Sequence, residues 1–362
     1  MAIDAKCKTT AMGIMPHTSV DSALELASSL DIPFWPQLPR VSYAEDMYVQ
    51  ASHEFPGTAV DFANRRITFD TVRFEQELPG YFDRIEQGAS FALRSDQSMA
   101  YREFLGKDLG HFHAIRGQMI GPVSFGFNIV DENRKPIIYN DEVRAILFDF
   151  IQKKTNAQYE ELVIKNPNAF VWLDEPGLTY LFSGLSGYNE RHAKEDYDSL
   201  LRGLKGPKGL HLCANVNLPY LLELGIKILS FDAYQIEFMP KEYAMYVERF
   251  IKSGCIISWG IVPTESTVLS TENPQSLAER LLGYWAVISS ATGISTKEIG
   301  KQSLVAPARC CLADIGQLVD VEKPIHRPEG SCQLPSIEEE IVAKAFKYLG
   351  EISQILIDKC GF

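Results

Sequence analysis

The feature that most constrains the fold is a regular alternation of short apolar runs with longer helical stretches along the 362-residue chain. Several of these runs are continuously apolar, which is typical of parallel strands covered on both faces. A strand–helix unit repeated about eight times indicates an α/β fold, a (β/α)8 TIM barrel. A doubly wound sheet is the rival fold, but it would need fewer strands. The expected strands are residues 11–15, 66–69, 118–125, 170–173, 209–213, 227–231, 256–261 and 303–306.

Helical patterns fill the intervals between these runs. Residues 141–157 begin with acidic side chains and carry lysines near the end, which complements the helix macrodipole. Residues 276–293 and 337–360 are amphipathic, and 220–225 is a short helix closed by glycine. The length also allows two domains, but we expect a single catalytic TIM barrel over residues 1–362.

Two loop-rich segments, near residues 32–57 and 322–336, do not follow this alternation. Residues 32–40, with the sequence IPFWPQLPR, contain three prolines and should be extended. The second segment is polar and rich in proline, which is typical of a loop. Both are expected over a face of the barrel, either as plain surface loops or as parts of the site.

Composition excludes several classes of function. The formal net charge is −12 with no dense block of lysine and arginine, which argues against a nucleic-acid partner. No apolar stretch approaches about 18 residues, so no membrane-spanning helix is expected. The first residues lack the apolar core of a signal peptide, and we expect a cytoplasmic protein. Seven scattered cysteines in a reducing compartment then indicate buried residues, metal ligands or catalytic thiols.

A His-x-Cys sequence, His211 and Cys213, lies at the end of an expected strand. Side chains two residues apart on a strand point to the same face, so these two can meet one ion. Asp232 ends the next expected strand, and Cys310 and Cys311 follow the last one. Imidazole, carboxylate and two thiolates from three strand ends would suit a tetrahedral zinc site. Zinc would deprotonate a substrate thiol, and the thiolate is the nucleophilic form.

The same residues also have an ordinary structural interpretation. Buried cysteine is common and behaves as a small hydrophobic residue, so His-x-Cys alone is a weak signal. The pair Cys310 and Cys311 could instead be redox-active or simply packed in the core. Adjacent residues of a strand face opposite ways, so only one of the two is expected to bind the ion.

Five motifs, in order over most of the chain, resemble the catalytic C-terminal barrel of cobalamin-independent methionine synthase, within the uroporphyrinogen decarboxylase-like barrels. The match is to a short, single-barrel form. Residues 12–16 (MGIMP) resemble the family's Ile-Gly-Ser-Phe-Pro, and 117–123 (GQMIGPV) resemble Gly-Met-Leu-Thr-Gly-Pro-Val. Residues 173–176 (LDEP) resemble Ile-Asp-Glu-Pro, while His211-x-Cys213 and Cys310-Cys311-Leu312 resemble the family's His-x-Cys and Cys-Gly-Leu.

The resemblance implies a catalytic Zn²⁺ held by His211, Cys213 and Cys310, with Cys311 as a bystander. The family's remaining ligand is a glutamate, and Asp232 stands in its place, shorter by one methylene. Glu237 is the alternative carboxylate, beyond the expected strand.

Substrate binding is implied in the same way. Asp174, beside Glu175, would hold the amino group of homocysteine, unless both only cap a loop. Gly13 and Ile14 correspond to the segment that holds the substrate carboxylate, where Ile14 replaces the family's serine and leaves only its backbone N–H.

Other candidates are weaker. The family's second amine-binding carboxylate has no clear counterpart near residues 40–47. Arg40 could bind a carboxylate, but a structural role is the expected one. We also expect His17 and His113 to be structural.

The resemblance therefore implies a methyltransferase that makes methionine from homocysteine. The chain has room for one barrel where the classical enzyme has two, which favours a methylated corrinoid protein over methyl-folate as donor. Three alternatives stay open: another thiol acceptor such as coenzyme M, a uroporphyrinogen decarboxylase-like reaction, and a non-catalytic metal- or corrinoid-binding protein.

Overall fold

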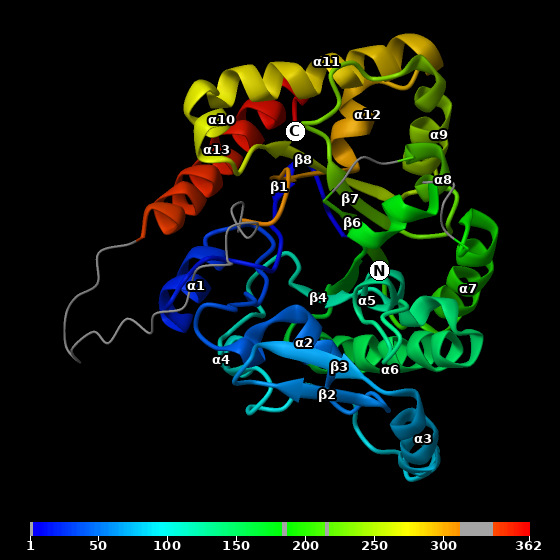
Figure 1. Ribbon diagram of the computed structural model, residues 1–362. Helices are drawn as coiled ribbons and strands as arrows, with labels where there is room; N and C mark the ends of the chain where they lie inside the picture. The colour runs from blue at the N-terminus through cyan, green and yellow to red at the C-terminus, as the bar shows by residue number, and fades with distance from the viewer. Residues whose placement is uncertain (1–2, 183–186, 214–216, 312–335) are drawn as a thin grey trace, which may run out of the picture.

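The centre of the molecule is a parallel sheet of seven strands with helices packed around it (Figure 1). The computed structural model describes residues 3–182, 187–213, 217–311 and 336–362. The strand order is β1-β9-β8-β7-β6-β5-β4, and every neighbouring pair is parallel. The strands are β1 (Lys8–Thr9), β4 (Arg116–Ile120), β5 (Phe170–Asp174), β6 (Lys208–Leu212), β7 (Ile228–Asp232), β8 (Ile256–Val262) and β9 (Ser303–Pro307).

The prediction of a closed barrel of eight strands is wrong for the part of the chain described above, which forms a curled sheet of seven. Residues 32–37 lie between the edge strands β1 and β4. Gln37 N donates to Gly13 O at 2.7 Å on one side, and Arg116 N donates to Pro33 O at 2.9 Å on the other. Only isolated bridges form, because proline lacks the N–H that a regular ladder requires.

Two of the expected strands differ from the prediction: one is absent and the other is shorter. Residues 11–15 form no strand, and only an isolated bridge at Ile14 is present there. In the 118–125 run, β4 ends at Ile120 and the helix α5 (Pro122–Asn128) begins directly, with proline in its first turn. Proline suits that position because its missing N–H would have no helical partner there.

The long outer helices agree closely with the prediction. The helix α6 (Asp141–Lys165) extends the expected 141–157, while α11 (Pro274–Thr292) and α13 (Ile337–Cys360) match theirs. Capping boxes fix the starts of α11 and α13. The others are α1 (Val20–Ala27), α2 (Met47–Ser52), α3 (Thr71–Glu86), α4 (Met99–Gly106), α7 (Glu190–Gly203), α8 (Leu218–Leu222), α9 (Lys241–Lys252), α10 (Ser266–Thr271), α12 (Thr296–Lys301), and the 3₁₀ turns η1 (Tyr43–Glu45), η2 (Ile137–Tyr139) and η3 (Pro176–Phe182).

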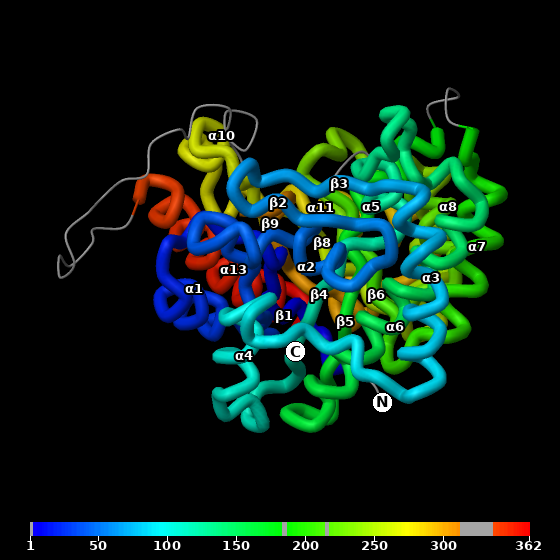
Figure 2. Tube along the Cα trace, turned by 60° about the horizontal axis from the view of Figure 1, so that its bottom comes forward, coloured from blue at the N-terminus to red at the C-terminus, as the bar shows by residue number. Residues whose placement is uncertain are grey.

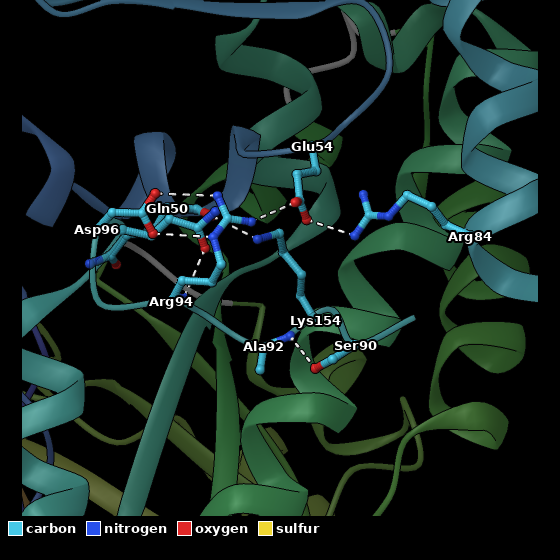
Figure 3. A network of polar contacts seen from close by, with 9 residues as sticks. Gln50, Glu54, Arg84, Ser90, Ala92, Arg94, Asp96 and Lys154 are labelled. Carbon is cyan, nitrogen blue, oxygen red and sulfur yellow. Dashed lines mark hydrogen bonds and ion pairs between the residues drawn. The ribbon is translucent and has the colours of Figure 1, made fainter. Parts of the chain in front are cut away.

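The expected strand at 66–69 exists, but it belongs to a separate antiparallel hairpin. There β3 (Arg66–Phe69) pairs with β2 (Thr58–Asp61), outside the parallel sheet (Figures 1 and 2). A charged cluster joins the elements around this hairpin to α6 (Figure 3). In it, Glu54 accepts from Arg84 at 2.7 Å and from Arg94 at 2.6 Å. Lys154 of α6 donates to Gln50 O at 3.0 Å.

The beginning and end of the described chain lie together. Figures 1 and 2 both show α1 beside α13, and Thr18 N donates to Glu339 Oε1 at 3.1 Å.

Residues 322–335 of the second predicted loop lie outside the described residues. No helix in the described ranges is both long and apolar enough to cross a membrane.

Candidate functional site

The carboxyl ends of β5, β6 and β7 bring three polar side chains into one row. Asp174 of β5 is the register partner of His211 in β6, and His211 is the partner of Ser230 in β7. All three are buried. In a parallel α/β fold this edge of the sheet is where ligands bind, so the candidate site lies at the expected end.

His211 and Cys213 face each other across the end of β6. The imidazole Nε2 lies 2.6 Å from Cys213 Sγ, and Nδ1 lies 3.0 Å from Ser230 Oγ. Burial, together with the positive charge of Arg116, lowers the pKa of His211 to about 3. The ring is therefore neutral at physiological pH, and Nε2 offers a lone pair if Nδ1 carries the proton toward Ser230.

The second thiol of the cluster comes from the loop after β9. Cys310 is in hydrogen-bonding contact with Cys213, and this contact, followed by burial, raises the pKa of the Cys213 thiol. The neighbouring Cys311 packs into the hydrophobic core and is only 5% exposed. One imidazole and two thiols therefore converge, and Cys311 lies apart from them in the core.

This donor set fits zinc, although its atoms are not arranged around a common centre. Within the described ranges, no three His, Cys, Asp and Glu side chains are grouped so that they could hold a metal ion. Two ligands of one tetrahedral zinc would lie about 3.6 Å apart, given Zn–S and Zn–N bonds of about 2.3 and 2.1 Å. At 2.6 Å, Nε2 of His211 and Sγ of Cys213 are closer than that, so the Cys213 side chain would have to turn.

Asp232 is engaged by other residues. Its side chain is 1% exposed and accepts a hydrogen bond from the backbone N–H of Gln235 at 3.1 Å. It also accepts from the side-chain amide of Gln235 and from Arg309 Nε at 2.9 Å. To coordinate an ion it would have to give up some of these bonds. Glu237, the alternative carboxylate, is exposed.

Asp174 and Glu175 have separate roles in the structure. Glu175 is fully buried and accepts from the amides of Val123 at 3.0 Å and Ser124 at 2.7 Å, from the Ser124 hydroxyl and from Tyr197. It therefore anchors the start of α5. Asp174 Oδ1 is buried and has no hydrogen-bond partner among the described residues. Burial raises the pKa of Asp174, and the positive charge of Arg116 opposes that rise.

The segment containing Gly13 and Ile14 lies beside the cysteine pair. Cys311 N donates to Ile14 O at 3.3 Å, and Gln37 N donates to Gly13 O at 2.7 Å. A Cβ on Gly13 would lie 2.6 Å from the side chain of Gln118, so a larger residue here would have to displace that side chain. The opening segment therefore approaches the site closely, with these two carbonyl groups already used.

An aromatic and cationic stack below the imidazole was missed by the sequence interpretation. The Arg116 guanidinium lies 3.9 Å from the centroid of the Trp172 ring, and Trp172 stacks on His211 with centroids 5.5 Å apart. Arg116 is fully buried and also donates to Gln118 Oε1 at 3.0 Å. The only sequence signal for this stack was Arg116 itself, an arginine at the start of an apolar strand. Whether its side chain points inward depends on the register of the sheet.

The remaining sequence candidates lie elsewhere or serve the fold. Arg40 forms an ion pair with Glu338, as its structural interpretation predicts. Glu45 accepts from the first amides of α4, so it acts as a helix cap. His113 is exposed, and His17 is buried with lowered pKa caused mainly by burial.

Comparison with protein-family models found no family that matches this chain, and comparison with curated proteins found no match. Functional inference therefore depends on the geometry of the site and on the sequence motifs.

Proposed function

We propose that this protein is a zinc-dependent methyltransferase that moves a methyl group to the thiol of homocysteine and forms methionine. The observation that carries the proposal is the approach of Cys310, from the end of β9, to His211 and Cys213 at the end of β6. Zinc bound there would supply the chemistry that a free thiol lacks at neutral pH, because it binds the thiolate form.

The surrounding residues prepare the cluster for such an ion. Ser230 fixes the orientation of the His211 ring through Nδ1, and partners of this kind set the tautomer of metal-binding histidines. The low pKa of His211 keeps the ring neutral across the physiological range, so Nε2 can bind an ion when Nδ1 carries the proton. Three protein ligands leave a fourth position for a substrate sulfur, which is the usual difference between catalytic and structural zinc.

Asp174 favours an acceptor that carries an amine. Its Oδ1 is buried without a partner in the described residues, and a substrate ammonium would provide the missing donor. Homocysteine has such a group, whereas coenzyme M has none. In the transfer, the S–CH₃ bond forms while the bond between methyl and donor breaks, and its electron pair stays with the donor.

The proposed donor is a methylated corrinoid protein. A methyl on cobalt leaves more readily than a methyl on a folate nitrogen. The corrinoid would have to reach the carboxyl ends of the strands, where Cys213 and Cys310 lie. This assignment depends on the sequence resemblance.

The test is to purify the protein, measure bound zinc, and assay methionine formation from homocysteine with methylcobalamin or methyl-folate. We expect stoichiometric zinc and product with methylcobalamin. Cys310→Ser should lose both, whereas Cys311→Ser, at the adjacent buried thiol, should keep both. Full zinc content in Cys310→Ser, or no methionine from either donor with zinc-loaded wild-type protein, would overturn the proposal.

A further inference from the structure

Arg309 is the charged residue that stands directly beside the thiol cluster. It follows β9 and precedes Cys310, and its Nε donates to Asp232 Oδ2 at 2.9 Å. The Asp232 side chain is 1% exposed, whereas the Arg309 side chain is 45% exposed. A buried carboxylate therefore anchors one edge of the guanidinium, and the Arg309 side chain remains partly exposed to solvent.

The two terminal nitrogens of this guanidinium have at most one long ion pair among the described residues. Nη1 of Arg309 lies 3.4 Å from Glu265 Oε1, and the Glu265 side chain is 52% exposed. Exposed pairs of this kind contribute little to stability. Nη2 has no hydrogen-bond partner in the parts of the chain that the structure describes. Two parallel N–H groups of this type match the two oxygens of a carboxylate.

Arg309 and Asp174 are a basic and an acidic residue that both lie near the thiol cluster. Arg309 is adjacent to Cys310 in sequence. The hydrogen bond to Asp232 is the main cause that raises the pKa of Arg309, and the charge of Cys213 raises it further. Asp174 in turn feels the charge of Cys310. An α-amino acid with a thiol side chain presents one ammonium, one carboxylate and one sulfur, which corresponds to these three features.

We propose that Arg309 binds the carboxylate of the acceptor, so that the site selects thiols of the α-amino acid class over simple amines and sulfonates. The inference deepens the proposed function and depends on it for the identity of the reaction. Of the carboxylate-binding candidates from the sequence, Arg40 is paired with Glu338. At Ile14, the carbonyl accepts from Cys311 N and only the N–H would be left for a substrate. Glu265 acts as the stand-in carboxylate that the substrate displaces.

The test is a binding measurement that does not require turnover. Calorimetry would compare L-methionine with 3-(methylthio)propylamine, which lacks only the carboxylate, on wild-type protein and on Arg309→Gln. We expect Arg309→Gln to weaken methionine binding by about 10- to 100-fold, the range for a charged bidentate hydrogen bond, and the amine by less than about 2-fold. Equal losses for both ligands, unchanged methionine binding, or no methionine binding to wild-type protein would overturn the inference.

A second variant covers the case in which Arg309→Gln fails to fold because Asp232 loses its partner. Glu265 is half exposed, and its side chain forms no cap bond to α10. Glu265→Gln should therefore fold and bind methionine about 2- to 5-fold more tightly, because the competing carboxylate is gone. Weaker or unchanged binding in this variant would count against the displacement.

Kinetics separate this inference from the proposed function. If wild-type protein methylates homocysteine, Arg309→Gln should raise KM for homocysteine and leave KM for 3-aminopropane-1-thiol unchanged, with little change in kcat. A KM for homocysteine that does not move would overturn the role of Arg309 while the transferase stands. Absence of methyl transfer together with carboxylate-dependent binding of methionine would overturn the transferase while the binding site stands.

Discussion

The buried ammonium of Lys154 should make the stability of this protein depend on pH. Lys154 is 2% exposed in α6, and Nζ has one hydrogen bond, to Gln50 O (Figure 3). The nearest carboxylate, Glu54, is held by Arg84 and Arg94. Burial therefore dominates and lowers the pKa of Lys154 from 10.5 to about 7, although the charge of Glu54 opposes the shift.

The sign follows from the protons that each state binds. Between pH 7 and 10.5 the unfolded chain keeps Lys154 protonated while the folded protein releases the proton, so folding becomes more favourable as pH rises. Well inside this window each pH unit changes the free energy of unfolding by about 1.4 kcal/mol. From pH 7, where the folded group is half deprotonated, to pH 9 the change is about 2 kcal/mol. Below pH 7 both states are protonated and the full cost of burying the charge remains.

The perturbation is Lys154→Met, which keeps the length of the apolar stem and removes the charge. It also leaves Gln50 O without its donor, a cost of about 1 kcal/mol that does not vary with pH. Urea unfolding at pH 7, 8 and 9, at constant ionic strength, should show the wild-type free energy of unfolding rising relative to the variant by about 2 kcal/mol. Lys165→Met, at an exposed lysine of the same helix, is the control and should parallel wild type. If Lys154→Met also parallels wild type, the ammonium does not have the low pKa on which this reasoning depends.

Three further predictions concern the site. Ser230→Ala should free Nδ1 of His211 and weaken zinc binding by about 10-fold in competition with a chelator, while Ser230→Thr should retain it; equal affinities would exclude the orienting role. Glu175→Gln should lower the free energy of unfolding by about 2–3 kcal/mol, because an amide NH₂ would face donors that now meet a carboxylate, and an unchanged melting temperature would contradict this. Gly13→Ala should destabilise by about 1–3 kcal/mol through its contact with Gln118, measured by urea unfolding, and a neutral effect would mean that the side chain can move aside.

The strands and helices that the sequence predicted best are those with local signals at both ends. The prediction of 337–360 matches α13 at both ends, where Ser336 forms a capping box and Gly361 adopts a left-handed C-cap. Continuous apolar runs likewise located β5 to β9 within about two residues, the usual uncertainty of a boundary. The closed barrel was not obtained, since Pro33 and Pro36 lack the amide hydrogens that a regular strand needs there. Composition alone could not show that residues 32–37 still lie between β1 and β4.

In the candidate site, too, the contacts with a local sequence signal could be predicted, and the contacts between distant residues could not. The approach of His211 to Cys213 follows from two-residue spacing on one strand, which any sequence analysis can use. The ion pair of Asp232 with Arg309 joins residues 77 positions apart, and the anchoring of α5 by Glu175 spans about 50. Such pairings depend on which strand ends become neighbours, so local sequence patterns could not separate a bound carboxylate from an available one.

That distinction decides how the two buried aspartates of the site can act. Asp232 has both oxygens engaged by Gln235 and Arg309, so its charge is already compensated and it serves as an anchor. Asp174 has Arg116 as a nearby positive charge but no hydrogen bond to Oδ1 in the described residues. A buried acceptor without a donor costs free energy, and a ligand that brings an N–H group recovers it. Under the proposed function, a preference for an ammonium should therefore arise at Asp174, whereas Asp232 should act indirectly, by holding the Arg309 that we propose binds the carboxylate.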